Sequence, residues 1–590
     1  WEAWKEGVVE RLADHFGEEG EAADLSSAFF SQNAGKGVRL FELLSKRYDV
    51  VAANPPYMGS SSMGNMLKKY INDFYELGKR DLYSVFILRC VQLTRFKGKV
   101  AMVTRQSWMF LRSYAKLRVI NESKQGDSER KEFKGLLKSP CIECLAQLGA
   151  NAFEEISGEV VNVGLFTLSK NEPHADHKIM AFRLIGLRSP KEKSKALTKN
   201  CIEQRSTTKY HPKQLDMLKI PGSPLSYWLP DPIFMIFCNS KQVLDFGFMG
   251  WGVSSSNNDR FLRYNWEGNL SKRWLLHAKA GSYGRWAGMV NHLLDWDGDG
   301  IKLKSFILER YPYLGNNYEI KIRPYTFSKV GWTYSSMGAS CIGARLLERE
   351  HTTNAKSPAI FLEENNLELG AYLNSRVSSY LIRAVGPDLN IDEGYVGVLP
   401  IPEPINNNKL ACLVQLCILF KKRILSYAPT ERTFNYTCLK HLEETFCISA
   451  LISTNEGVCE DIVNSKYDLE FADIEAIVSE TGTPAGWHPL IPSYDPLPPL
   501  PDGLPEIPQE VLDYLAEHER RTLSPDDLAT LKANLRTLYE AGPGAKVEIE
   551  DDSTSGDGEE EEVAGAYIPI PAETFLEELS QKLQIHPISV

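Results

Sequence analysis

The chain has no apolar stretch that approaches the roughly 20 residues of a membrane-spanning helix. Its longest mainly apolar segment, Leu410 to Phe420, has the length of a helix in a protein core. The first residues also lack the pattern of a secretory signal. We therefore expect no membrane contact. With 590 residues, the chain is too long for one core, and we expect two to four domains.

Metal-binding patterns are also missing. The 11 cysteines are scattered, which is typical of a protein in a reducing cytoplasm, and the pair Cys141 and Cys144 has no matching second pair. Asp295 to Gly300 imitates a calcium loop, but Phe306 stands where such a loop needs glutamate. Glu319 and Lys321 have a nuclease-like spacing without a clear partner turn. We therefore expect neither a metal nor a nuclease site.

An overall excess of positive charge is missing, since 77 acidic residues outnumber 66 basic ones and the net charge is −11. The acidic excess is concentrated in residues 501–590, which hold 21 acidic and 6 basic residues. The remainder holds 56 acidic and 60 basic residues and is mildly basic. This distribution permits contact with nucleic-acid phosphates without requiring it.

The most informative stretch is Tyr48 to Tyr57, YDVVAANPPY. The apolar run from Val50 to Ala53 predicts a short, fully buried strand. Pro55 and Pro56 stop it, because proline has a fixed φ and no N–H for a ladder. The sequence therefore predicts a stiff turn at the carboxyl end of a strand, where open α/β sheets bind ligands.

The turn carries groups that suit a planar amine. The Asn54 side chain offers a carbonyl acceptor, the Pro55 carbonyl is free to accept, and Tyr57 offers a flat ring. Pro56 fixes the geometry of the turn. Two acceptors and an aromatic face can hold an exocyclic –NH2, such as that of adenine, and direct its nitrogen toward an electrophile.

Strand and helix patterns alternate after this turn. The expected strands are Asp49–Ala53, Lys99–Thr104, Ile142–Leu148 and Val160–Leu168, and the expected helices are Leu67–Tyr75, Asp81–Thr94 and Tyr114–Ile120. This order predicts an α/β sheet, the second half of a doubly wound one, with its last strands antiparallel.

The string NPPYMGS, DLYSVFI and GKVAMVTRQSWMF resembles the motif order of N6-adenine DNA methyltransferases, and above all the PglX-like methyltransferases of bacteriophage-exclusion (BREX) defence systems. The resemblance covers roughly residues 45 to 450. It implies methyl transfer from S-adenosylmethionine to adenine N6 in double-stranded DNA, with Asn54, Pro55, Pro56 and Tyr57 as catalytic residues. It also implies a flipped target base and a role in marking host DNA, with other phage-defence proteins as partners.

Two further expectations follow from the resemblance. An aromatic residue before the last strand packs against the flipped base in such enzymes, and Phe153 is the candidate here. The glycine-rich cofactor motif lies upstream of NPPY in the family. Phe16 to Gly20 follows a helical pattern rather than a strand, so we expect that this motif is absent and that the chain is truncated at both ends.

The segment from Phe246 to Pro402 is rich in glycine, serine and aromatic residues and resembles the target-recognition domain of these proteins. Side chains of this mixture can read base edges in a DNA groove. The candidates for DNA contact are Arg260, Arg263, Lys279 and Arg285. Residues 170–220 carry an excess of Lys and Arg, which predicts a solvated connector or an arm that follows phosphates.

The predicted fold class is therefore α/β: the second half of a Rossmann-like methyltransferase sheet, an α+β target-recognition domain, and a mostly helical C-terminal region. The expected parts are a helical lead-in (1–47), a catalytic subdomain (48–170), a basic connector (171–245), a target-recognition domain (246–405), a helical spacer (406–480), and a tail with a Pro-rich linker and an acidic insert (481–590). Three alternatives remain: methylation of a glutamine amide in a release factor, a DNA-recognition or complex-forming subunit without methyl transfer, and a bifunctional restriction-modification enzyme.

Overall fold

The computed structural model describes residues 36, 40, 43–120, 133–153, 161–187, 189–202, 208–268, 270–279, 283–336, 342–386, 391–403, 405, 407–435, 442–482 and 484. They belong to two compact units. The first comprises Trp1–Leu218 and Gly222–Trp228, and the second comprises Lys219–Pro221 and Leu229–Val590. Most of the expected lead-in and nearly all of the expected tail lie outside the described residues. Among the helices that are described, none is long and apolar enough to cross a membrane.

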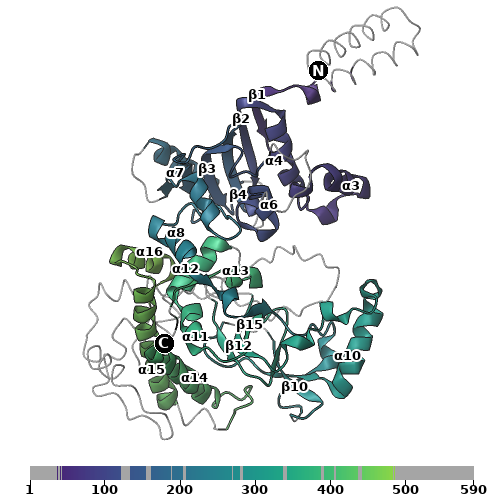
Figure 1. The fold of residues 1–590 in the computed structure, drawn as a ribbon, viewed down its shortest axis with the longest axis vertical. Coiled ribbons are helices and arrows are strands. Elements are labelled where there is room, and N and C mark those ends of the chain that lie inside the picture. The colour runs from purple at the N-terminus through teal and green to yellow at the C-terminus, as the bar shows by residue number, and fades with distance from the viewer. Residues whose placement is uncertain are drawn as a thin grey trace, which may run out of the picture. The chain divides into compact units, whose positions relative to one another are not determined.

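The first unit is built on a six-stranded sheet with the order β1-β2-β4-β3-β5-β6 (Figure 1). β1 and β2 are parallel, and β4 lies antiparallel between β2 and β3. The four expected strands are confirmed, as is the antiparallel arrangement at the end of the series. The strands are β1 (Tyr48–Ala53), β2 (Thr94–Arg105), β3 (Cys141–Gly149), β4 (Val163–Ser169), β5 (Met180–Arg183) and β6 (Lys209–Tyr210).

Two helices connect β1 to β2 and confirm the helical expectation there. α3 (Asn65–Phe74) buries Ile71, and α4 (Leu82–Leu93) buries a run of side chains that includes Tyr83 and Ile87. The helix expected at Tyr114–Ile120 is shorter, because a 3-10 turn precedes it. The remaining short elements of this unit are η1 (Ser60–Ser62), η2 (Glu76–Gly78), α5 (Ser107–Phe110), η3 (Arg112–Tyr114), α6 (Ala115–Arg118) and α7 (Pro190–Ile202).

The expected burial of β1 is wrong. Val50 is 64% exposed, and only Tyr48, Val51 and Ala53 of the strand are half-buried. β1 is the edge strand of the sheet, and within the described residues it pairs only with β2. An apolar run indicates that a strand can be buried. Whether it is buried depends on the strands and helices that pack around it.

The expected connector at 171–245 is also corrected. β5 and β6 are strands of the main sheet, with β5 parallel to β3 and β6 antiparallel to β5. The first compact unit accordingly runs to Leu218, well past the expected limit at residue 170. The Lys- and Arg-rich composition of this region gave no indication of its two short strands.

The second unit contains two four-stranded sheets, with the orders β14-β10-β11-β9 and β13-β12-β15-β8, and a short pair of β16 and β7. Its strands are β7 (Lys241–Gln242), β8 (Phe248–Gly250), β9 (Leu262–Tyr264), β10 (Trp274–Ala278), β11 (His292–Asp295), β12 (Val330–Thr333), β13 (Arg345–Leu347), β14 (His351–Thr353), β15 (Ala359–Leu362) and β16 (Pro400–Ile401). The loop-rich α+β character expected of this region is therefore present.

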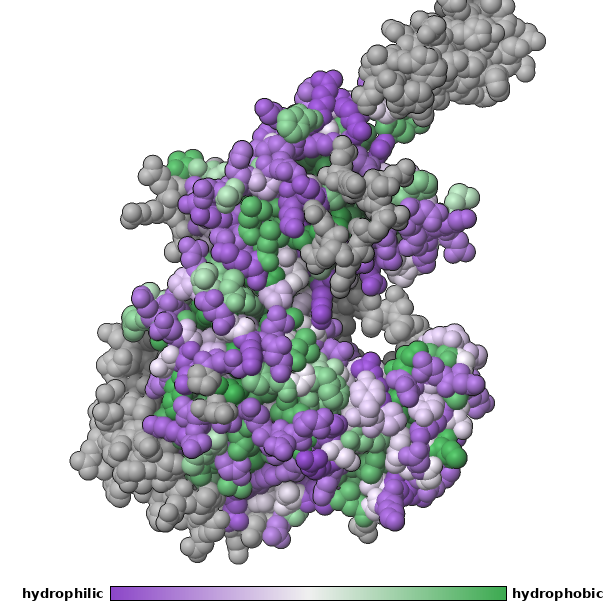
Figure 2. All heavy atoms as spheres, viewed as in Figure 1, coloured by the Kyte–Doolittle hydropathy of each residue, from purple (hydrophilic) through white to green (hydrophobic). Residues whose placement is uncertain are grey.

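Most helices of the second unit lie in its C-terminal part, where the helical region 406–480 was expected. α14 packs against α15 and α11. The helices are α8 (Asp231–Asn239), α9 (Asn258–Phe261), α10 (Asp297–Arg310), α11 (Leu367–Asn374), α12 (Arg376–Val385), α13 (Glu393–Gly397), α14 (Asn408–Leu425), α15 (Leu442–Lys466) and α16 (Phe471–Thr481), with 3-10 turns η6 (Val243–Asp245), η7 (Pro312–Leu314), η8 (Tyr318–Ile320) and η9 (Pro324–Thr326). Figure 2 shows hydrophilic residues interspersed with smaller hydrophobic patches on the visible face of each unit.

Candidate active site

The turn Asn54–Tyr57 directly follows Ala53, the last residue of β1. Ala53 is in register with Met102 of the parallel strand β2, so both strands end at the same edge of the sheet. Asn54 and Pro56 are exposed, Pro55 is buried, and Tyr57 is half-buried. The sequence therefore located the turn correctly, and the exposed Asn54 side chain is accessible to a ligand.

Polar groups of the turn are available for binding. Neither the Asn54 side chain nor the Pro55 carbonyl forms a hydrogen bond with another residue in the described part of the chain. Amide and carbonyl oxygens accept hydrogen bonds from N–H groups. Among the described residues, the turn therefore keeps two unused acceptors, one on the exposed Asn54 side chain and one on the backbone of the buried Pro55.

Tyr57 lies beside the N-terminus of α4. Its ring contacts the Tyr83 ring edge to face, with centroids 6.1 Å apart and planes at 84°. Burial raises the pKa of the Tyr57 hydroxyl, while the charge of Arg105 lowers it and that of Asp81 raises it. The Tyr57 hydroxyl has no hydrogen-bond partner among the described residues. The raised pKa keeps the Tyr57 hydroxyl protonated at neutral pH.

Asp81 connects the turn to α4. Its Oδ1 accepts hydrogen bonds from the backbone N–H of Met58 at 3.0 Å and of Tyr83 at 3.2 Å. The N–H of Leu82 donates to the Met58 carbonyl at 3.0 Å, and the N–H of Ser60 donates to the Arg80 carbonyl at 2.9 Å. Sequence reasoning placed the start of the helix at Asp81 but missed this connection.

Two glutamines extend the same sheet edge. Gln106 follows β2 and accepts a hydrogen bond from the Gln147 amide nitrogen of β3 at 3.0 Å. The Tyr227 hydroxyl donates to Gln147 Oε1 at 2.7 Å. Phe153 is half-buried in the segment after β3, whose carboxyl end lies at this edge too. The glutamine pair carries no motif that could have marked it in the sequence.

Arg260 and Lys279 are two of the residues expected to contact DNA, and both keep their charged groups available. Arg260 is exposed, and its guanidinium lies over the rings of Phe261 at 5.2 Å and Phe306 at 5.0 Å. Lys279 is half-buried and forms no hydrogen bond or ion pair with any described residue. Burial, together with the nearby charge of Lys279, lowers the pKa of His292 to about 4.

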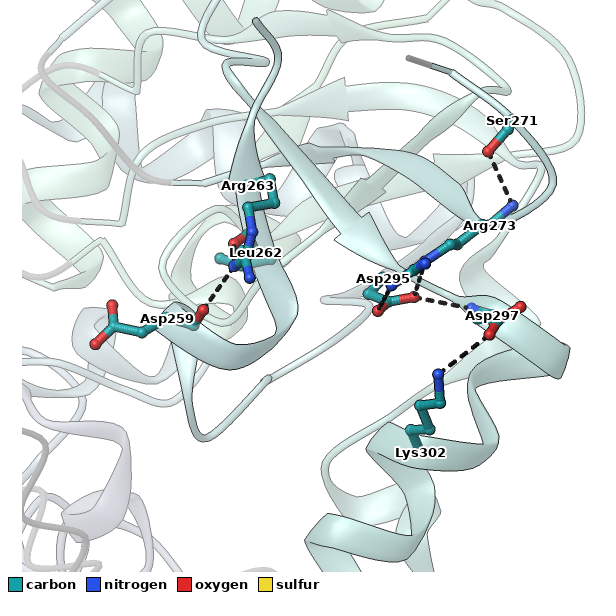
Figure 3. Close-up of polar contacts among 8 residues, drawn as sticks. All are labelled: Asp259, Leu262, Arg263, Ser271, Arg273, Asp295, Asp297 and Lys302. Carbon is teal, nitrogen blue, oxygen red and sulfur yellow. Dashed lines mark hydrogen bonds and ion pairs between the residues drawn. The ribbon is translucent and has the colours of Figure 1, made fainter. Parts of the chain in front are cut away.

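The guanidinium groups of Arg263 and Arg285, the other two, donate hydrogen bonds to groups of the protein itself. One Arg263 nitrogen donates to the carbonyl oxygens of Asp259 and Leu262, both at 2.6 Å (Figure 3). Arg285 forms an ion pair with Glu456 of α15 at 3.2 Å, and its side chain is only 15% exposed. These contacts favour a structural role for both residues.

The acidic loop that imitates a calcium site is occupied by cations of the chain itself. Arg273 pairs with Asp295 at 2.9 Å and Lys302 with Asp297 at 3.3 Å, as Figure 3 shows. A third pair joins Lys304 to Asp299 at 2.8 Å. The carboxylates are therefore neutralised by ion pairs.

Comparisons with known proteins agree with the motif. The family model described as Eco57I restriction-modification methylase matches residues 4–132. The adenine-specific methyltransferase PglX of Lacticaseibacillus casei (strain Zhang) is 28% identical over 392 residues, which is 62% of this chain and 30% of that protein. The adenine-specific methyltransferase BrxX of Escherichia coli O9:H4 (strain HS) is 29% identical over 446 residues, 72% of this chain and 34% of that protein.

A solved structure of the Type IIL restriction-modification enzyme MmeI in complex with DNA has a TM-score of 0.44 and 12% identity, over 73% of this chain and 56% of that chain. A likeness of this strength is too weak to place any residue or ligand. The chain spans about a third of the length of the curated relatives it matches. These matches confirm the resemblance that the sequence motif indicated: the chain is similar to PglX-like adenine-specific methyltransferases.

Proposed function

We propose that the protein transfers a methyl group from S-adenosylmethionine to the N6 amine of adenine in DNA at a specific sequence. The observation that carries this proposal is the turn Asn54–Tyr57, at the carboxyl edge of a parallel strand pair. It has a half-buried ring and two acceptors that bond to no described residue, on the exposed Asn54 and the buried Pro55. The curated relatives that this chain matches are adenine-specific methyltransferases.

The chain's own residues would act by positioning. The adenine amine is a weak nucleophile, because its lone pair is delocalised into the ring. Hydrogen bonds from the amine to the Asn54 side-chain oxygen and the Pro55 carbonyl favour a pyramidal, more electron-rich nitrogen and fix its direction of attack. The Tyr57 ring stacks on the base, and Pro55 and Pro56 keep the turn rigid. Phe153 is the proposed second aromatic contact.

S-adenosylmethionine supplies an electrophilic methyl carbon when it is bound. Within the described residues, no glycine-rich turn leads from a strand into a helix beside β1. We therefore assign no described residue to the cofactor. The described part of the first unit supplies the side of the reaction that binds the amine.

The DNA substrate requires that the target base leave the duplex, because the turn cannot reach an adenine inside a base stack. We propose that residues 246–405 recognise the target sequence and that Arg260 and Lys279 contact DNA there. Both retain an available cation, whereas Arg263 and Arg285 donate to groups of the protein. The helical region 406–480 supports this part through α14 and α15. Host-DNA marking alongside other phage-defence proteins is the biological role that we propose.

The test maps N6-methyladenine at base resolution in host DNA. Cells carry the natural gene with its operon in wild-type form, as Asn54→Ala, or as the control Asn72→Ala. Asn72 is an exposed asparagine of α3 in the same unit. We expect one sequence motif to be methylated in the wild type and the control and unmethylated in Asn54→Ala.

Equal methylation by a folded Asn54→Ala variant would contradict the mechanism. Absence of any methylated motif in the wild type, with the protein expressed and folded, would instead favour a DNA-recognition or complex-forming subunit without methyl transfer.

A further inference from the structure

Asp81 is a buried carboxylate with a double task. It is 5% exposed and forms the N-cap of α4 by accepting the Tyr83 N–H. The same oxygen, Oδ1, also accepts the N–H of Met58, the residue that follows Tyr57. This carboxylate oxygen therefore joins the end of the candidate catalytic turn to the start of α4, beside the backbone hydrogen bond from the Leu82 N–H to the Met58 carbonyl.

The helix side of this connection is firmly held. The Ser84 hydroxyl lies 2.6 Å from the Asp81 carbonyl and 2.7 Å from the Gly78 carbonyl. Gly78 leaves no space for a side chain, since a Cβ there would lie 2.8 Å from the backbone nitrogen of Val85. Interiors packed this closely tolerate little displacement. Asp81 is consequently attached to a rigid frame.

The turn itself has few anchors of its own. Its first end is fixed by the pairing of Ala53 with Met102 in the sheet. Its second end is fixed by two backbone N–H groups: that of Met58 donates to the Asp81 carboxylate, and that of Ser60 donates to the Arg80 carbonyl. Gly59 and Asp81 also form an isolated antiparallel β-bridge there. Because the Asn54 side chain and the Pro55 carbonyl make no hydrogen bond with described residues, these two ends determine where the acceptors point.

We infer that Asp81 is a positioning residue for methyl transfer, which holds the Asn54–Tyr57 turn in register with α4 through the Met58 N–H. This inference rests on the proposed function and extends it to a residue that does not touch the substrate. Misplacement of reacting groups by about 1 Å costs on the order of 100-fold in rate. The effect of losing the connection falls on kcat rather than on binding of DNA.

Three substitutions separate positioning from simple helix capping. Asp81→Ala removes both hydrogen bonds. Asp81→Ser restores a good N-cap for the Tyr83 N–H, but its shorter side chain does not reach Met58. Asp81→Asn keeps an oxygen at the Oδ1 position, but it removes the charge and replaces the second carboxylate oxygen by an NH2 donor. The control is Asp49→Ala, which removes an exposed carboxylate paired with Arg95 at the opposite end of β1.

The measurement is kcat and KM for DNA methylation, with the protein as its natural gene encodes it, purified with the proteins of its operon. We expect Asp81→Ala and Asp81→Ser to lower kcat on the order of 100-fold with KM for DNA nearly unchanged. Asp81→Asn recovers most of the rate, and Asp49→Ala equals the wild type.

Two results would overturn the inference. If Asp81→Ser has the wild-type kcat, Asp81 is only a helix cap. If Asp81→Asn is as slow as Asp81→Ala although it folds, the charge matters and not the connection to Met58. Circular dichroism and thermal melting identify any variant that fails to fold, and Asp81→Ser then decides the question because its helix cap is retained.

The failure of the proposed function is a different result. In that case the wild type and Asn54→Ala give the same methylation, whatever the Asp81 variants do. If methylation depends on Asn54 while the whole Asp81 series keeps the wild-type kcat, the inference alone fails.

Discussion

Replacing Arg285 by alanine separates a structural arginine from one that contacts DNA. The Arg285 guanidinium donates to Glu456 Oε2 at 3.2 Å, and the other carboxylate oxygen accepts the Trp286 indole N–H at 2.6 Å. Trp286 is 2% exposed. Glu456 lies on α15 and so connects two consecutive residues of a loop to a helix far away in the sequence. Arg285→Ala removes one side of this connection.

The size of the effect follows from the burial of the pair. An exposed ion pair contributes about 0–1 kcal/mol, whereas removing one partner of a fully buried pair costs about 3–5 kcal/mol. The side chains of Arg285 and Glu456 are 15% and 23% exposed, between those limits, and Glu456 keeps its bond from Trp286 in the variant. We expect Arg285→Ala to destabilise the second unit by about 2 kcal/mol, or about 4–8 °C in Tm.

Substitutions of Glu456 give the matched comparison. Glu456→Ala leaves both the Trp286 indole and the Arg285 guanidinium without this carboxylate, and we expect a loss of about 3–5 kcal/mol. Glu456→Gln keeps an acceptor for Trp286 and loses the charge, so its cost is smaller, about 1 kcal/mol. The double variant Arg285→Ala with Glu456→Gln is less destabilised than the sum of the two single changes.

Thermal unfolding and DNA binding are measured on the same proteins. A residue that neutralises a DNA phosphate lowers the slope of log K against log salt by about 1 when it is removed. We expect this change for Lys279→Ala and no change for Arg285→Ala. An Arg285→Ala protein with an unchanged Tm and a slope reduced by about 1 would refute the structural assignment.

Two further predictions concern pH and the catalytic turn. Burial raises the pKa of Glu460 to about 7, so the folded state keeps a proton that the unfolded state loses near pH 4.5; stability of the second unit therefore falls as the pH rises from about 5 through 7. Glu460→Gln, which keeps an acceptor for the Arg376 N–H at 2.7 Å, should flatten this dependence in melts between pH 5 and 8, and an unchanged slope would contradict the reasoning. The buried Tyr57 hydroxyl has no partner among the described residues, so we expect Tyr57→Phe to methylate DNA within about threefold of the wild type and Tyr57→Ala to lose activity. Mapping of N6-methyladenine compares the two variants. Loss of activity in Tyr57→Phe would show that the hydroxyl is needed.

The local order of the first unit followed from the sequence alone. The turn Asn54–Tyr57, the strand before it, and the helix starting near Asp81 were all predicted where the structure has them, with Asp81 as the N-cap of α4. Each depends on interactions over a few residues. Proline ends a ladder by its own covalent geometry, and an aspartate caps the helix that begins next to it. Such features need no knowledge of the rest of the chain.

The tertiary structure decided what those elements touch. Only the sheet order shows that β1 pairs with one strand alone among the described residues, with Val50 exposed. It also shows that β5 and β6 extend the sheet from a segment whose composition predicts a connector. Only packing brings Glu456 to Arg285, 171 residues away, and joins Asp81 to Met58 across the loop that contains α3. Contacts between distant residues leave no periodicity in the sequence. The sequence therefore determined where the candidate catalytic turn lies, while the tertiary structure decided which contacts hold it and which of the candidate DNA-contacting cations have no ion-pair partner among the described residues.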